Sequence, residues 1–208
     1  MQITPRAEDG AGLTVTEAAR RAQIVAATIA TIAELGYAKT SFAKIKERAG
    51  LSSTRIIGYH FTNKAGLMMA VLTAITGAKE EFLRDRAGAP AGRAAMLRAH
   101  IETEVAFLGA YPEYVRVLAE LAGGVDDPAG WAIAGPVLEG MRTGQVIRVL
   151  TQGRREGAFG EFDPEVVGRS VAHAIDGAAA AYAENPALDL GHYGTELADL
   201  FDRATRPA

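Results

Sequence analysis

Apolar residues recur every three or four positions along most of the chain, which is the spacing of one face of an α-helix. The first stripe comprises Ile24, Val25, Ile29, Ile32 and Leu35. We expect Thr16 to cap this helix, because a threonine before an acidic first turn satisfies free N–H groups. Gly36 follows the stripe, where a glycine ends a helix. Alternation with a period of two, typical of strands, is nearly absent, so the pattern predicts an all-α protein.

Two short helices are predicted next, over about residues 41–49 and 53–60, with Gly50 in the turn between them. The hydroxyl residues that can cap them are Thr40 or Ser41 for the first and Ser52 or Ser53 for the second. Asn63 can cap a fourth helix. The first three helices and their tight turn have the pattern of a helix-turn-helix, whose third helix enters the DNA major groove.

Longer helical segments follow, separated by clusters of turn-forming residues. The last two are predicted over residues 164–183 and 191–204, with Pro164 at a helix start. We therefore divide the chain into an N-terminal arm (1–14), a three-helix domain (15–64) and a larger helical domain (65–208).

The charge is divided unevenly between these parts. Residues 16–64 carry eight Lys and Arg against three Asp and Glu, whereas residues 65–208 carry 13 against 20. A basic segment joined to an acidic one indicates a module that binds a polyanion. Chance asymmetry is the alternative. Hydrophobic residues make up 49% of the 208 residues, which is typical of a globular protein with a substantial core.

Other classes are disfavoured by composition. The chain has no cysteine, which excludes disulfides and thiolate chemistry. No apolar run approaches the length of a membrane span, and residues 1–13 do not resemble a signal peptide. We therefore expect no membrane association and a cytoplasmic location.

Two stretches resemble a known family: residues 40–53 (TSFAKIKERAGLSS) and residues 59–64 (YHFTNK). They are similar to the DNA-binding domain of TetR-family repressors, and the likeness extends over about residues 16–71. The family has an N-terminal helix-turn-helix domain and a helical C-terminal domain that dimerises and binds a small effector. Gly58 departs from the pattern, since many members have a bulky residue there. The segment between Gly50 and Tyr59 is also one residue longer than the commonest form.

The resemblance implies roles for individual side chains. Thr40 and Lys64 are expected to hold phosphates, with further backbone contacts from Tyr59 and His60. The polar outer face of the third helix contains Ser52, Ser53, Thr54 and Arg55. We expect the last three to contact bases, and Arg55 is the best candidate for a bidentate bond to guanine. The alternatives are His60 as a packing residue and Arg55 as a plain surface charge. We interpret Lys44 and Lys46 as solvated surface lysines, with a phosphate contact as the alternative for each.

The C-terminal half has weaker signals. By resemblance, its last two helices form a homodimer interface, where Ala172, Ala174, Gly177, Ala178 and Ala179 allow close packing. The alternative places this small-residue run in the core of one subunit. An effector pocket is expected among the helices of residues 93–157. The candidates to line it are aromatic residues and residues set in apolar stretches of the sequence: His100, Glu104, Phe107, Tyr114, Trp131 and Met141.

No catalytic motif is present. His173 and Asp176 share a helical face, but no third metal ligand is evident, so neither a metal nor another cofactor is expected. The sequence thus predicts a dimeric, DNA-binding repressor, not an enzyme, released from a near-palindromic operator by a small-molecule effector. An all-helical small-molecule-binding protein or enzyme with a vestigial helix-turn-helix is the alternative.

Overall fold

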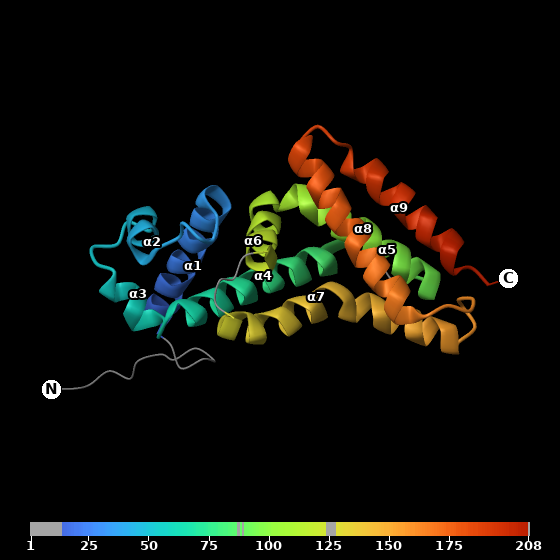
Figure 1. The fold of residues 1–208 in the computed structure, drawn as a ribbon, viewed down its shortest axis with the longest axis horizontal. Helices are drawn as coiled ribbons and strands as arrows, with labels where there is room; N and C mark the ends of the chain where they lie inside the picture. Colours follow the sequence, from blue (N-terminus) through green and yellow to red (C-terminus); the bar gives the residue numbers. More distant parts are fainter. Residues whose placement is uncertain (1–13, 87, 89, 124–127, 208) are drawn as a thin grey trace. The chain divides into compact units, whose positions relative to one another are not determined.

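The computed structural model describes residues 14–86, 88, 90–123 and 128–207, without the side chains of residues 122–138 and 141. The predicted N-terminal arm, apart from Thr14, lies outside these residues. The described part contains nine helices and no strand, which confirms the all-α prediction (Figure 1). The helices are α1 (Val15–Leu35), α2 (Phe42–Arg48), α3 (Arg55–His60), α4 (Lys64–Arg86), α5 (Arg93–Ala110), α6 (Pro112–Gly123), α7 (Pro128–Arg155), α8 (Pro164–Glu184) and α9 (Leu190–Thr205).

Thr14, not Thr16, caps α1, so that prediction was wrong. Oγ1 of Thr14 accepts a hydrogen bond from the Glu17 N–H at 3.3 Å, and Oε2 of Glu17 accepts one from the Thr14 N–H at 2.9 Å. This reciprocal pair is a capping box, which needs Glu three residues after the cap. Only Thr14 has that spacing to Glu17, so the helix starts two residues earlier than predicted.

The structure also decides which residues cap α2 and α3, where the sequence left two candidates for each helix. Ser41 caps α2, accepting from the Lys44 N–H at 3.4 Å, while Thr40 precedes the cap. Thr54 stands at the start of α3 without a side-chain capping bond, and the nearby Ser53 hydroxyl accepts from the Arg55 N–H at 3.2 Å. α3 is therefore shorter than predicted.

The helices group into two compact units, each described by itself. The first contains α1, α2, α3, the beginning of α4 and α6 from Arg116 onward. The second contains α4 from Ala78, α5, the start of α6, and α7 to α9. The functional boundary that we placed after Lys64 stays a prediction.

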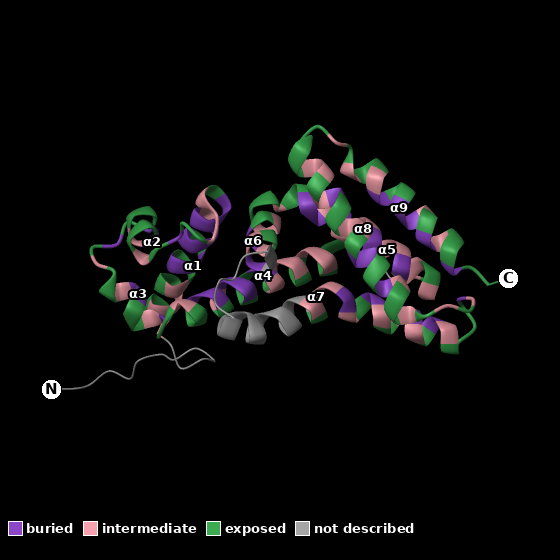
Figure 2. Ribbon diagram, in the orientation of Figure 1, coloured by how far each residue is buried: buried purple, intermediate pink, exposed green. Residues whose placement is uncertain are grey.

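The first unit is held by fully buried aliphatic side chains from four helices. They are Ile24 and Ile32 of α1, Ile45 of α2, Ile57 of α3, and Leu67 and Val71 of α4 (Figure 2). Burial of each such side chain stabilises the fold by about 1.5–3 kcal/mol. Because α2 and α3 are too short to be stable alone, this shared core fixes their orientation.

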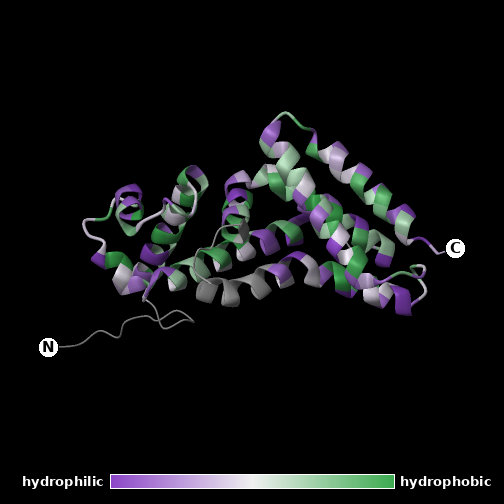
Figure 3. Cartoon of the chain, viewed as in Figure 1, coloured by the Kyte–Doolittle hydropathy of each residue, from purple (hydrophilic) through white to green (hydrophobic). Residues whose placement is uncertain are grey.

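In the second unit, α5 packs against α7, α8 and α9. The core includes Ile101 and Val105 of α5, Leu150 of α7, Val171 of α8 and Phe201 of α9. Hydrophobic and hydrophilic residues alternate along these helices (Figure 3), and the buried hydrophobic ones form this core. The last two helices match their predicted bounds to within one residue, and Asp163 caps α8 with Pro164 at its first position. None of the helices in the described residues is long and apolar enough to cross a bilayer.

Candidate nucleic-acid interface

The turn between α2 and α3 is fixed by its backbone and by buried anchors. Gly50 has φ 62°, a left-handed conformation that glycine adopts without strain. Leu51, Ile57 and Phe61 are buried on the inner side, whereas Ile56 is only partly buried. With its inner side anchored in this way, α3 turns its remaining side chains outward.

The outward face carries the polar residues predicted to meet DNA. Ser52, Thr54 and Arg55 are exposed, and Ser53 is partly buried. Tyr59 is 76% exposed. A large aromatic side chain so exposed to solvent is unusual on a helix surface. Together with Arg55, Tyr59 makes this face suited to a polar, anionic partner.

His60 and Tyr59 are positioned by residues of α1 that sequence analysis did not single out. The Tyr59 hydroxyl donates to Oε1 of Glu17 at 3.3 Å. The rings of Tyr59 and His60 meet edge to face, with their centroids 5.1 Å apart. Arg21 donates to the His60 carbonyl and stacks over the Phe61 ring at 4.3 Å. The basic pair at positions 20 and 21 was the only sequence signal for such a role.

The imidazole of His60 is half-buried. Burial, followed by the charge of Arg21, lowers the pKa of His60 below its ordinary value. In the free protein at neutral pH the neutral form of the ring is therefore favoured.

The two predicted phosphate ligands, Thr40 and Lys64, both contact the turn that follows α1. The Thr40 side chain is 4% exposed, and its hydroxyl donates to the Gly36 carbonyl at 2.9 Å. Nζ of Lys64 lies 4.0 Å from the centroid of the Tyr37 ring, a cation–π contact. The structure thus brings these side chains to one place. Because the Thr40 proton is already used, a phosphate contact there requires it to rotate.

The lysines of α2 have less distinctive surroundings. Nζ of Lys44 donates to the Lys39 carbonyl at 3.0 Å and the side chain is exposed, while Lys46 is partly buried. Gln23 of α1 donates to the Ala49 carbonyl at 2.7 Å and so binds the end of α2 to α1. This bond fixes α2 as part of the scaffold for α3.

We predict that Gly58→Ala stabilises the free protein. Gly58 is exposed on α3, and a Cβ built there meets no atom within 4 Å. Alanine in a helix is favoured over glycine by about 1 kcal/mol, so the unfolding midpoint in urea should rise. A lower midpoint would contradict this account of the free helix. Weaker DNA binding by this more stable variant would indicate that the DNA backbone approaches α3 closely at position 58.

In the second unit, three of the predicted effector residues, His100, Glu104 and Phe107, follow one another along α5, and Glu104 belongs to a partly buried ion pair. His100 is 7% exposed, and its Nδ1 is buried with no hydrogen-bond partner among the described residues. Glu104, one turn further along α5, forms a salt bridge with Lys79 at 2.8 Å. Burial lowers the pKa of His100, and the Lys79 charge adds to that effect while Glu104 opposes it. Phe107 follows on the same face of α5.

Aromatic side chains continue this face. The Phe107 and Tyr111 rings stack at 4.9 Å, and Tyr111 and Tyr114 stack at 5.2 Å. Phe82 meets Phe107 and Tyr111 edge to face, at 5.5 and 5.7 Å. We call the group of Phe82, Phe107, Tyr111 and Tyr114 the aromatic cluster. The predicted contacts Trp131 and Met141 have side chains outside the described part.

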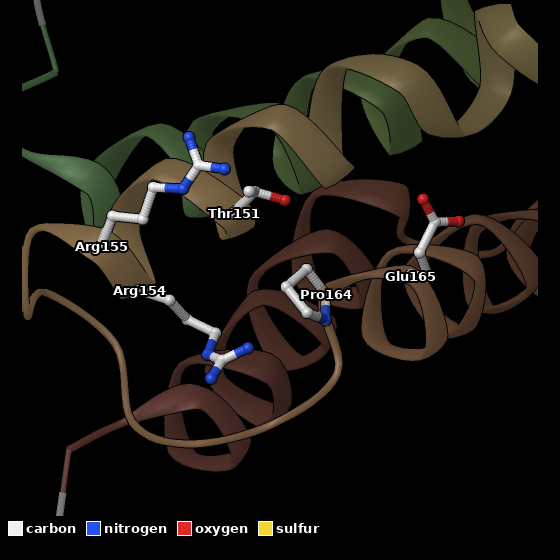
Figure 4. A pocket seen from close by; sticks show the side chains of 5 residues that line it. All are labelled: Thr151, Arg154, Arg155, Pro164 and Glu165. Atoms are coloured by element: carbon white, nitrogen blue, oxygen red, sulfur yellow. The ribbon is translucent and has the colours of Figure 1, made fainter.

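Two hollows of the second unit lie elsewhere. One of about 420 Å³ is lined by Thr151, Arg154, Arg155, Pro164 and Glu165 (Figure 4). The other, of about 320 Å³, lies along α9 and is lined by Leu188, Asp189, His192, Tyr193, Glu196, Leu197 and Leu200. Neither contains a predicted effector residue. The lining of the first hollow contains both positive and negative side chains, since Arg154 and Arg155 lie there with Glu165. Arg154 also forms an ion pair with Glu161.

The His173–Asp176 pair does not form part of a metal site within the described residues, where no suitable group of three ligands occurs. Nδ1 of His173 lies 3.5 Å from the Asp176 carboxylate, which also binds Arg142. This carboxylate is therefore engaged in an ion pair.

The small residues of α8 divide between two surroundings. Ala172 and Ala178 are buried in the core of the subunit, and Ala174 and Ala179 pack against it. Only Gly177 of the predicted five is exposed. For the other four, the alternative of packing within one subunit is the one that the structure supports.

The fold and the outward face of α3 define a helix-turn-helix protein. Residues 24–71 match the family model described as bacterial regulatory proteins, tetR family. The HTH-type transcriptional regulator BetI from Stenotrophomonas maltophilia is 39% identical over 87 residues. That match covers 41% of this chain and 44% of the relative, so it spans less than half of the relative's length. The N-terminal residues that match are therefore similar to the N-terminal region of TetR-family regulators.

Solved structures extend the likeness of fold to most of the chain. FadR from Bacillus halodurans, a fatty acid degradation regulator, has a TM-score of 0.76 at 20% identity over 88% of this chain and 94% of that one. FadR from Bacillus subtilis, solved with stearoyl-CoA, has a TM-score of 0.74 at 21% identity over 86% and 96%. At these identities the likeness establishes the fold alone.

Proposed function

We propose that this chain is a TetR-family regulator, a dimeric repressor that binds a near-palindromic operator and leaves it when a small molecule binds the second unit. The observation that carries the proposal is the outward face of α3, where exposed polar and basic side chains stand on a helix anchored from behind by Ile57. The excess of basic residues in positions 16–64 supports an anionic partner.

The proposed DNA contacts divide into two kinds. Lys64, Thr40, Tyr59 and His60 hold phosphates, which gives affinity without sequence preference. Ser53, Thr54 and Arg55 face the bases, with Ser52 beside them at the edge of the groove. Because Arg55 is exposed at the first position of α3, its guanidinium has free reach toward a guanine edge.

The proposed homodimer uses the outer faces of α8 and α9. On α8, exposed residues recur at intervals of four and three positions, forming a stripe of Val166, Ser170, His173, Gly177 and Ala180. Val166 is 60% exposed, and Leu200 of α9 is 52% exposed beside the hollow along that helix. Apolar and small side chains left in water along one face favour cover by a second copy. A two-fold dimer also suits two major-groove half-sites about 34–36 Å apart.

We predict that Leu200→Glu shifts the protein toward monomers. The side chain is largely exposed in one subunit, so the fold should persist, but a charge would be buried in the proposed interface at high cost. Light scattering after size exclusion measures the mass. Met69→Glu, at an exposed apolar residue of α4, is the matched control and should leave the mass unchanged. A Leu200→Glu protein with the wild-type mass would contradict the proposed interface.

The proposed effector site is the aromatic cluster together with His100, Glu104 and Lys79. The His100 nitrogen, which has no partner among the described residues, lies beside an ion pair and offers directional hydrogen bonding, and the aromatic rings offer an apolar surface. Trp131 and Met141 remain candidates by sequence. The Bacillus subtilis relative was solved with stearoyl-CoA, and a ligand with an apolar portion is consistent with this cluster.

The function is tested by selecting duplexes from a random-sequence pool with the wild-type protein and titrating the selected duplex at two salt concentrations. We expect a preferred near-palindrome whose binding weakens steeply as salt rises, because bound phosphates release counterions. Failure to select any sequence would contradict the proposal. The rival protein with a vestigial helix-turn-helix predicts normal cellular function after Arg55→Ala and Lys64→Ala are combined; we expect regulation to be lost.

A further inference from the structure

Two polar side chains of α6 bind the C-terminal end of α1. Nη1 of Arg116 donates to the Ala33 carbonyl at 3.1 Å, and Oε2 of Glu120 accepts from the Tyr37 N–H at 2.9 Å. Arg116 and Glu120 are four residues apart and therefore lie on one face of α6. All these residues belong to the compact unit that also contains α2 and α3.

The bond from Arg116 gives the C-terminal end of α1 a positively charged partner that α1 itself does not provide. The last carbonyls of a helix have no partner within it and carry partial negative charge, but the last turn of α1 has no basic residue. Arg116 supplies that cation. Gly36 has φ 80°, and a Cβ on it would stand 3.0 Å from Oε2 of Glu120. Glycine at this position thus permits both the turn and the approach of the Glu120 carboxylate.

Both predicted phosphate ligands contact the same turn, residues 36–37. Thr40 binds the Gly36 carbonyl and Lys64 lies over the Tyr37 ring. We propose that Arg116 and Glu120 are positioning residues for DNA binding, which hold this turn so that Thr40 and Lys64 face the phosphates. The inference rests on the proposed DNA-binding function and extends it to two residues far from the helix-turn-helix in sequence.

The test compares Glu120→Ala with the wild type on two duplexes, the selected one and a scrambled version of it. We expect both affinities to fall by about tenfold, the effect of losing one hydrogen bond to a charged group. The ratio of the two affinities should not change, because phosphate contacts carry no sequence information. Hydrogen exchange at the Tyr37 amide, measured without DNA, should become faster.

Two variants of the same helix serve as controls. Glu120→Gln retains an acceptor oxygen and should keep most of the affinity and of the Tyr37 protection. Glu113→Ala removes an exposed carboxylate from the first turn of α6 and should change neither. Wild-type affinity in Glu120→Ala, or unchanged exchange at Tyr37, would overturn the inference. Absence of selective binding by the unsubstituted protein would instead contradict the proposed function, and the inference would fall with it.

Discussion

Replacing Arg55 with alanine should lower affinity for the selected duplex by about 5- to 150-fold, equivalent to about 1–3 kcal/mol, while binding to scrambled DNA changes far less. Arg55 begins α3 and is exposed, and its N–H is held by the Ser53 hydroxyl. A guanidinium bound in bidentate fashion to guanine contributes to discrimination between bases. Anisotropy titrations on both duplexes measure the two affinities separately.

Lys64→Ala is the matched control for Arg55→Ala, since it also removes one positive charge. Loss of the Lys64 charge should weaken binding to both duplexes equally and reduce the slope of log affinity against log salt by about one. Equal losses on both duplexes in the Arg55 variant would show that Arg55 acts as a phosphate contact or surface charge, contrary to the assignment. The unfolding curve of the Arg55 variant should match the wild type, whereas loss of the Lys64–Tyr37 contact should lower the stability of the Lys64 variant by at most about 1 kcal/mol.

The second large effect is expected at Gly153, where alanine should destabilise the fold by about 1–3 kcal/mol or more. A Cβ at Gly153 would overlap the ring of Phe159, which is 5% exposed and belongs to the core of the second unit. A Cβ there would also stand 3.1 Å from the Cβ of Arg93. Neither Phe159 nor α5 can shift without disturbing the other core side chains.

Gly58→Ala is the control for this substitution, because it adds the same methyl group to a helix where nothing stands within 4 Å. Helix propensity alone would make both variants more stable. Denaturant unfolding without DNA should therefore give opposite signs for the two. A stabilised Gly153→Ala protein would show that Phe159 relocates freely.

Much of the first unit could be predicted from the sequence because its features are local. The apolar spacing of α1, the glycine at position 50 and the polar face from Ser52 to Arg55 each follow from a few neighbouring residues. The cap of α1 was misplaced although it is local, because Thr16 lies nearer to the acidic residue. The spacing of three residues between Thr14 and Glu17 was the decisive signal.

The contacts that connect distant segments could not be predicted. Nothing in the sequence pairs Glu120 with Tyr37, Lys79 with Glu104, or Arg21 with the carbonyl of His60. Small residues were ambiguous for the same reason. Ala178 and Gly177 are neighbours in the sequence, yet one is fully buried and the other exposed, according to which way each faces.

The sequence by itself determined that the chain is helical and that residues 40–64 have the pattern of a helix-turn-helix, since helical periodicity, caps and turn residues act over a few positions. Only the tertiary structure decided which polar groups meet across long separations. It paired Arg116 and Glu120 with the end of α1 and gathered an imidazole, an ion pair and aromatic rings around α5. The physical reason is that such contacts depend on how helices pack, which a single helix does not encode.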